Sequence, residues 1–181
     1  NQPQPVYVSA SISIPEITPN HEELVPQPLT INFGIQKGEF TPQSVAPINL
    51  IGKIITQGIE ITPAIKGEWR WSSDSQLIFT PSEEWLAGQD YSIHTAPDFF
   101  TANTQLNSHD FSFRSKAFTA TIKEFKFYQD PVNSEARNAV ATIELNYPVS
   151  EESLKQNTSL IVQALHEGTI DLKAETIQFN Y

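Results

Sequence analysis

The sequence contains no cysteine and no methionine. Without cysteine the chain can form no disulfide, no thiolate nucleophile and no cysteine-ligated zinc site. Basic residues are also few: 11 lysines and arginines stand against 21 acidic residues, so the formal net charge is −10. The basic residues are scattered, whereas nucleic acids and anionic membrane surfaces are recognised by basic patches. Neither is an expected partner of this chain.

Long apolar runs are missing as well. No run comes near the roughly 18 residues that a membrane-spanning helix needs, so no direct insertion into a membrane is expected. The sequence begins with Asn1 rather than methionine, which indicates a processed product, a fragment or a recombinant form made for expression. Any signal peptide or lipid anchor would lie upstream of this sequence.

What the chain does contain is short segments in which apolar and polar residues alternate, the pattern of half-buried strands. Turn residues separate these segments, residues 34–56 are poorly periodic, and residues 96–108 are expected to form a loop. The expected strands lie at residues 6–14, 29–33, 59–61, 67–72, 77–80, 91–93 and 111–113. About seven short strands without a convincing helix predict an all-β fold, with an antiparallel immunoglobulin-like β-sandwich at residues 1–115.

All three tryptophans lie between residues 61 and 91. Trp69 and Trp71 are two residues apart, so on a strand they share one face. Two interpretations follow: the indoles fill the sandwich core, or they form an exposed platform on which a sugar ring stacks. The core is favoured because apolar partners follow closely in sequence, at Leu77, Phe79 and Tyr91. Trp85 and Leu86 are both expected to cover apolar surface as well.

Residues 116–181 predict a second unit. Strands are expected around Phe125 and Phe127 and at residues 139–147, 160–162, 170–172 and 177–179, and Ser150 is expected to cap a short helical turn. Residues 145–147 (Leu-Asn-Tyr) resemble residues 31–33 (Ile-Asn-Phe), at a separation that suits one module. These residues are too few for a complete sandwich, so the fold class is tandem antiparallel sandwiches, the second incomplete.

No catalytic, metal-binding or cofactor-binding residues are predicted. The histidines, His21, His94, His109 and His166, lie in separate segments without the spacing of a zinc site, so surface positions are favoured. His109 and Asp110 are consecutive and should point to opposite faces of a strand. No serine-nucleophile motif or phosphate-binding glycine loop is present. The chain is therefore not expected to be an enzyme.

Three pairs of adjacent acids, Glu22-Glu23, Glu83-Glu84 and Glu151-Glu152, could suggest calcium ligands or glycosidase carboxylates. Adjacent acids at the start of turns are more often solvated charges or charges at a helix terminus. The regular calcium-loop pattern is absent, so the latter interpretation is favoured.

An ordered series of short motifs resembles a known family. The motifs are Val45-Ala46-Pro47-Ile48, Gly52-Lys53, Ile61-Thr62-Pro63, Gly67-Glu68-Trp69-Arg70-Trp71, Leu77-Ile78-Phe79-Thr80-Pro81, Gly88-Gln89-Asp90-Tyr91, Phe127-Tyr128-Gln129-Asp130-Pro131, residues 137–141 and Tyr147-Pro148-Val149. In this order they resemble the amino-terminal macroglobulin-like domains of bacterial α2-macroglobulins. The resemblance covers most of residues 29–162.

The resemblance implies residues 1–115 as one macroglobulin-like sandwich and residues 116–181 as the start of a second. Such proteins are large periplasmic envelope proteins, commonly lipid-anchored, that trap proteases with a bait segment and often a thioester. Neither the bait nor the thioester cysteine is in this sequence, so the implied role is scaffold. The implied partners are neighbouring domains of the same chain and, through the full-length protein, proteases. The alternative is an immunoglobulin-like adhesion or carbohydrate-binding module of a bacterial surface protein.

Overall fold

The computed structural model describes residues 4–17, 25–129, 131–133, 137–166 and 169–175, and among these the side chains of 137–138 and 162–175 are not described. The chain divides into two compact units, Asn1–Ala120 and Thr121–Tyr181. The assignment of residues 1–115 and 116–181 as one complete and one incomplete macroglobulin-like domain stays a prediction. No helix of the described residues has the length and apolarity to cross a membrane.

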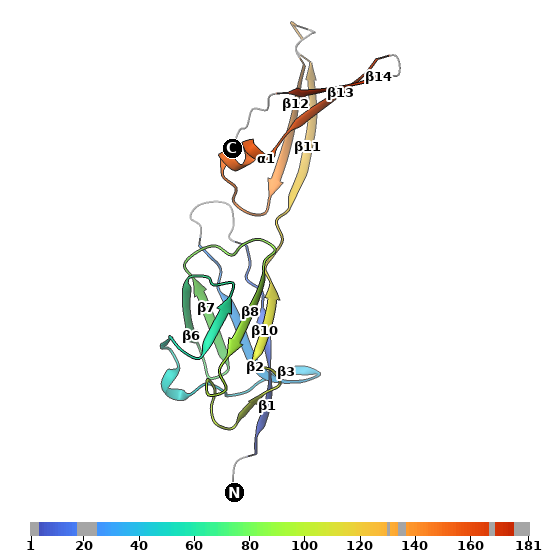
Figure 1. Cartoon of the computed structure of the whole chain (residues 1–181). Helices are drawn as coiled ribbons and strands as arrows, with labels where there is room; N and C mark the ends of the chain where they lie inside the picture. The colour runs from blue at the N-terminus through green and yellow to red at the C-terminus, as the bar shows by residue number, and fades with distance from the viewer. Residues whose placement is uncertain (1–3, 18–24, 130, 134–136, 167–168, 176–181) are drawn as a thin grey trace. The chain divides into compact units, whose positions relative to one another are not determined.

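The first unit is a sandwich of two curled β-sheets (Figure 1). Its strands are β1 (Val6–Ser13), β2 (Leu29–Lys37), β3 (Glu39–Pro42), β4 (Ile54–Ile55), β5 (Ile59–Thr62), β6 (Gly67–Trp71), β7 (Gln76–Pro81), β8 (Asp90–Thr95), β9 (Thr104–Leu106) and β10 (Asp110–Arg114), with a 3-10 turn at Ile48–Leu50. The larger sheet has the order β4-β6-β7-β2-β1-β9, with β3 paired to β2, and the smaller has the order β10-β8-β5. The predicted all-β, immunoglobulin-like fold class is confirmed.

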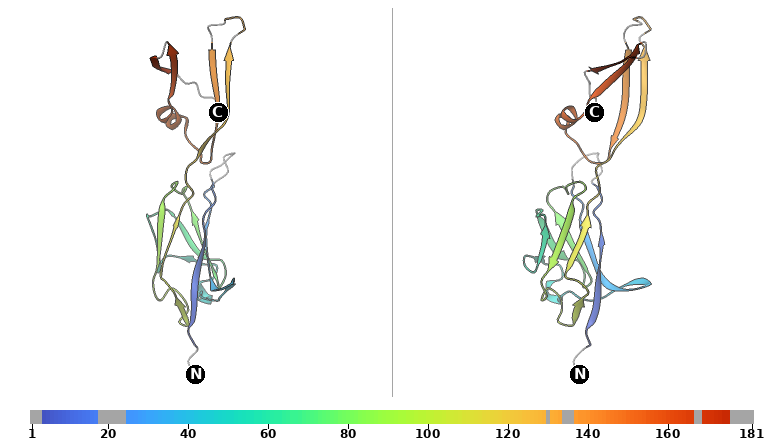
Figure 2. Two further views of the ribbon diagram at one scale, coloured as in Figure 1. Left: turned by 90° about the vertical axis from the view of Figure 1, so that its right-hand side faces the viewer. Right: turned by 45° about the vertical axis from the view of Figure 1, so that its right-hand side comes forward.

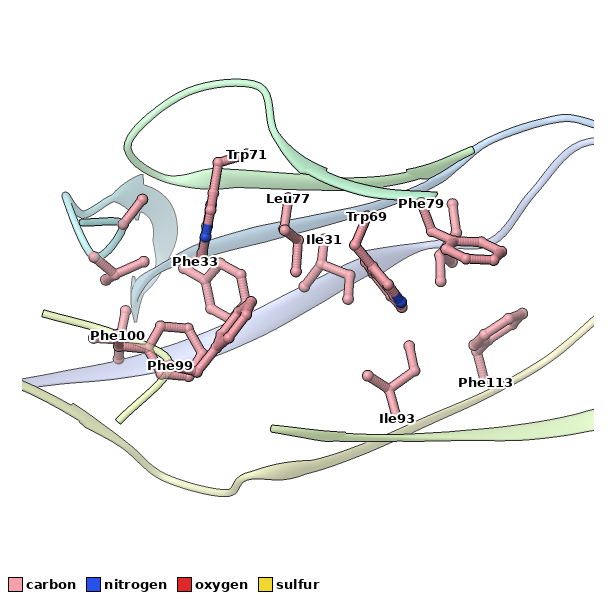
Figure 3. Close-up of a cluster of buried hydrophobic side chains, with 14 of the residues drawn as sticks. Ile31, Phe33, Trp69, Trp71, Leu77, Phe79, Ile93, Phe99, Phe100 and Phe113 are labelled. Atoms are coloured by element: carbon pink, nitrogen blue, oxygen red, sulfur yellow. The ribbon is translucent and has the colours of Figure 1, made fainter. Parts of the chain in front are cut away.

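Alternation along the strands decides which side chains enter the core. In β8 every second residue is buried, and in β6 the buried residues are Trp69 and Trp71. Figure 3 shows Trp69 pointing from the larger sheet toward Ile93 of the smaller one, and Trp71 pointing toward Phe99 and Phe100. The core has a large aromatic share, and its buried members are Val8, Leu29, Ile31, Phe33, Val45, Ala46, Trp69, Trp71, Leu77, Phe79, Trp85, Tyr91, Ile93, Phe99, Phe100 and Phe113.

Three features of this unit differ from the sequence prediction. The pairing is not wholly antiparallel, because β1 pairs parallel to β9, and β9 lies inside the predicted loop at 96–108. The poorly periodic stretch contains the end of β2 together with β3 and β4, which are too short to show a clear alternation. Leu86 is 63% exposed while Trp85 is 4% exposed. The expectation that Leu86 covers apolar surface is therefore wrong, since these neighbouring side chains point in different directions.

The second unit contains two hairpins and one helix. Strand β11 (Ala120–Gln129) pairs with β12 (Arg137–Leu145), and β13 (Leu160–His166) pairs antiparallel with β14 (Thr169–Glu175). Between them lies α1 (Glu151–Asn157), whose first-turn N–H of Ser153 donates to the Ser150 hydroxyl. The predicted helical turn with Ser150 as its cap is confirmed. The strand expected at 177–179 lies outside the described residues.

Candidate functional site

The tryptophan pair forms the centre of the core. Trp69 is 6% exposed and Trp71 is fully buried. The Trp71 ring lies 5.5 Å from Phe33 and 5.6 Å from Phe99, centroid to centroid, with the second pair stacked. These are the spacings of packed aromatic pairs. The core interpretation of Trp69 and Trp71 is confirmed, and neither indole is available to stack on a sugar.

Trp85 anchors a neighbouring aromatic cluster. Its Nε1–H donates to the backbone oxygen of Gln27 over 2.8 Å. Its ring meets Phe79, Tyr91 and Phe113 edge to face. A tryptophan needs a partner for its indole N–H when it is buried, and this hydrogen bond supplies one. The residue ties the segment before β2 to the core, which is a structural role.

Of the two histidines whose side chains the structure describes, His94 is the one paired with an acidic residue. It lies on the outward face of β8, opposite Asp110 of β10 and opposite Glu60 of β5. His94 Nδ1 is 2.7 Å from Asp110 Oδ1, and both side chains are more than half exposed. A pair so open to water contributes little to stability. A shallow depression of about 450 Å³ lies beside it, lined by residues 56–60, His94 and Ala96.

His109 has different surroundings from His94. His109 is half-buried, with its Nδ1 3.1 Å from the Thr95 hydroxyl, so it faces the opposite way from Asp110 as predicted. The surface position is confirmed for His94, and the half-buried His109 does not contradict it. His21 and the side chain of His166 lie outside the described residues. Across the part of the chain that the structure describes, no group of three or more His, Cys, Asp or Glu could hold a metal ion.

The acidic pairs have local structural roles where they are described. Glu83 Oε1 accepts a hydrogen bond of 2.8 Å from the backbone N–H of Lys66. Glu151 and Glu152 lie in the first turn of α1, where the helix dipole favours negative charge, and Glu151 pairs with Lys155 one turn later. The helix-terminus interpretation is confirmed for this pair. Glu22 and Glu23 lie outside the described residues.

A groove of about 560 Å³, which the sequence did not predict, lies between β1 and the β2–β3 hairpin. It is lined by residues 4–7 and Ser9 on one side, by residues 35–37 on the other, and by Asn107. No motif marks it, because it arises where two neighbouring strands stop pairing. The one available signal is Gly34 in the middle of an apolar strand, a position that often marks a bend or a close backbone approach.

With this geometry in view, the chain was compared with known proteins. No protein-family model matches it. It is 32% identical over 175 residues to the alpha-2-macroglobulin homolog of Yersinia pestis, which aligns with 93% of the chain. It is 34% identical over 146 residues to the alpha-2-macroglobulin of Pasteurella multocida and 31% identical over 120 residues to that of Rickettsia conorii. The chain belongs to the bacterial α2-macroglobulin family.

The chain spans only 8%, 7% and 6% of the lengths of these three α2-macroglobulins. What aligns is therefore one small part of a much larger protein. The sandwich of the first unit and the tryptophan-centred core are features of that part.

Proposed function

We propose that this chain is a structural scaffold segment, near the amino-terminal end, of a bacterial α2-macroglobulin-like protease inhibitor. In this proposal it contributes neither bait nor thioester and is not an enzyme. Its direct partners are neighbouring domains of the same chain, and proteases meet it only through the complete protein. That protein would reside in the periplasm, anchored to the envelope by lipid through an upstream segment.

The observation that carries the proposal is the surface of the second unit. Every residue of β11 is exposed. Large apolar side chains nevertheless line β11 and β12: Ile122, Phe125, Phe127, Tyr128, Val140 and Ile143 are each 45–65% exposed. A two-stranded hairpin is marginally stable in water, and large exposed apolar surfaces mark faces that pack against something. Further polypeptide of a much longer protein is the expected cover.

The solvent-facing chemistry of the first unit also fits a scaffold. His94 and Asp110 bond to each other on an open sheet face, and the depression beside them is shallow. A general base needs a reacting group within hydrogen-bond reach and a site that excludes water. The sugar-binding alternative is not favoured, because the two tryptophans that suggested it are buried.

A protease assay tests the functional half of the proposal. Residues 1–181 and the complete protein are each incubated with an endopeptidase, and cleavage of a large protein substrate is followed. The complete protein should inhibit, whereas residues 1–181 should show neither inhibition nor covalent capture of the protease. Inhibition or capture by residues 1–181 would overturn the scaffold role, and a complete protein without inhibition would overturn the inhibitor assignment.

A pair of substitutions tests the structural half. Phe125→Ala should cost the complete protein about 3 kcal/mol of unfolding free energy if further polypeptide buries this ring, since that is the low end for a buried Phe→Ala change. In residues 1–181, where the Phe125 side chain is 62% exposed, the cost should stay below about 1 kcal/mol. Ile48→Ala, at a position that is 85% exposed in the first unit, is the matched control. If Phe125→Ala lowers the unfolding free energy of both proteins by the same small amount, further polypeptide does not bury Phe125.

A further inference from the structure

Strand β1 changes its partner half-way along. Residues Ser9–Ser13 pair antiparallel with β2, whereas Val6–Val8 pair parallel with β9 on the other edge. Beyond Gly34, β2 pairs only with β3. From the Ser9–Gly34 pair outward, β1 and β2 therefore run apart, and the β2–β3 hairpin projects sideways from the sandwich (Figure 1; Figure 2, right). We call the space between them the wedge; it is the groove of about 560 Å³ described above.

On its β1 side the wedge exposes backbone groups that have no ladder partner among the described residues. The Val6 N–H donates to the Asn103 oxygen, and the Val8 oxygen accepts from the Asn107 N–H, so both residues direct their backbone groups to β9. Backbone groups alternate along a strand, so the N–H and C=O of Tyr7, which lies between them, face β2 instead. Continued from Ser9 and Gly34, the register would pair Tyr7 with Gln36, yet the ladder ends at Ser9.

The same holds on the β2 side. The Gln43 N–H donates to the Phe33 oxygen, which places the backbone groups of Phe33 and, by alternation, of Ile35 toward β3. The N–H and C=O of Gln36 therefore point away from β3 and into the wedge. Two strand edges, each with a free donor and a free acceptor, face one another across a groove.

Gly34 lies where β2 stops pairing with β1, and it allows a close contact with β3. A Cβ at this position would lie 2.4 Å from the Thr41 oxygen and 2.6 Å from the end of the Phe40 ring. The Phe40 ring thus lies directly over the Gly34 backbone, where no other residue would let it approach so closely. The close contact packs β3 against β2 at the residue where β2 stops pairing with β1.

We propose that an extended, acidic segment of the same complete protein, outside residues 1–181, enters the wedge and pairs as a strand with the backbone of Tyr7 and Gln36. Unpaired strand edges are completed by extended polypeptide, whose main chain supplies both donors and acceptors. Since β1 and β2 are antiparallel, the added strand runs antiparallel to one and parallel to the other. Among the described residues that line the wedge, Lys37 alone is charged, and it favours an acidic side chain in the segment.

The inference rests on the proposed function, which makes this chain a segment of a longer protein. The relatives are more than ten times as long as the aligned part, so such a protein offers many candidate strands. A tethered segment has a high effective concentration, commonly millimolar, and one short strand then suffices where a free peptide would bind weakly. These reasons favour the same chain over a separate protein as the source.

Amide hydrogen exchange at single-residue resolution tests the proposal. The amides of Tyr7 and Gln36 should exchange at least about tenfold more slowly in the complete protein than in residues 1–181, because a new hydrogen bond protects each. The amide of Ser11, already paired with Asn32 inside the β1–β2 ladder, should exchange equally in both proteins. Equal exchange of Tyr7 and Gln36 in both proteins would overturn the proposal. The wedge would then be an exposed strand edge at which Lys37 discourages pairing with other chains. Protection that appears only after a separate protein is added would overturn the assignment to the same chain.

A charge reversal tests the acidic character of the segment. Lys37→Glu should reduce the protection of Tyr7 and Gln36 in the complete protein roughly two- to fivefold, the effect of losing an exposed ion pair. Lys53→Glu makes the same charge change at an exposed turn away from the wedge and should leave the protection unchanged. Equal effects of both variants would contradict a specific acidic partner. Amide exchange tests whether a strand enters the wedge, and the protease assay tests the inhibitor assignment. Because the two are measured separately, the failure of one proposal can be told from the failure of the other.

Discussion

Replacing Trp71 by alanine should remove much of the stability of the first unit. The side chain is fully buried, and three phenylalanine rings surround it at centroid distances of 5.5 to 6.1 Å. A buried aromatic side chain removes about 150–250 Å² from water, worth about 4–6 kcal/mol at 25 cal/mol per Å². Measured Trp→Ala costs in protein cores are about 3–5 kcal/mol, because the cavity partly collapses. We therefore expect a loss of about 4 kcal/mol.

Urea unfolding followed by tryptophan fluorescence measures this loss. All three tryptophans belong to the first unit, so the signal reports on that unit alone. With a denaturant slope of about 2 kcal/mol/M, a loss of 4 kcal/mol lowers the midpoint by about 2 M urea. Ile48→Ala, at a residue that is 85% exposed, is the control and should shift the midpoint by less than about 0.3 M, the equivalent of 0.5 kcal/mol. A Trp71→Ala loss below about 1 kcal/mol would refute the account of Trp71 as the centre of the core.

Trp71→Phe separates ring packing from the polar edge of the indole. Within the described residues, the buried Trp71 Nε1–H has no hydrogen-bond partner, and such a donor costs about 1–3 kcal/mol. Phenylalanine keeps an aromatic ring against Phe33 and Phe99 but removes that donor, which offsets part of the smaller ring's lost packing. The variant should lose less than about 2 kcal/mol. A loss equal to that of alanine would show that the indole N–H is satisfied in solution.

Further substitutions test a close backbone contact, a hydrogen bond and a helix cap. Gly34→Ala should lower the free energy of unfolding, measured in urea, by more than about 2 kcal/mol, because its Cβ would overlap the backbone of β3. Gly38→Ala, at φ +79° in open space, should lower it by only about 1–2 kcal/mol. Equal losses would contradict the close contact at Gly34. Trp85→Phe removes the hydrogen bond to the Gln27 oxygen and should cost about 1–3 kcal/mol of unfolding free energy beyond the change in packing. A variant as stable as the parent in urea unfolding would contradict this. Ser150→Ala should destabilise α1 by about 1 kcal/mol, seen as faster amide exchange in its first turn, while the unfolding midpoint of the first unit stays unchanged.

Much of the fold can be predicted from local pattern. The alternation at residues 67–71 and in β8 is clear because each strand has one buried and one solvent-facing side, and a period of two leaves one possible set of inward residues. The packing of Trp69 and Trp71 and the cap at Ser150 follow in the same way. The candidate site was harder to predict from the sequence, since histidines and paired acids form a chemical site only when the fold brings them together. The structure pairs His94 with Asp110 across two strands and turns His109 the other way.

The sequence by itself determined the all-β class, the tryptophan core and membership in the bacterial α2-macroglobulin family, because periodicity and ordered motifs are local properties of the chain. The tertiary structure alone decided the strand partners. Strands as short as β4 and β9 have little preference of their own, and they form because a neighbouring edge supplies hydrogen bonds. The partner change of β1 and the wedge beside Gly34 were likewise decided by the tertiary structure, since whether a backbone group is paired depends on what lies opposite it.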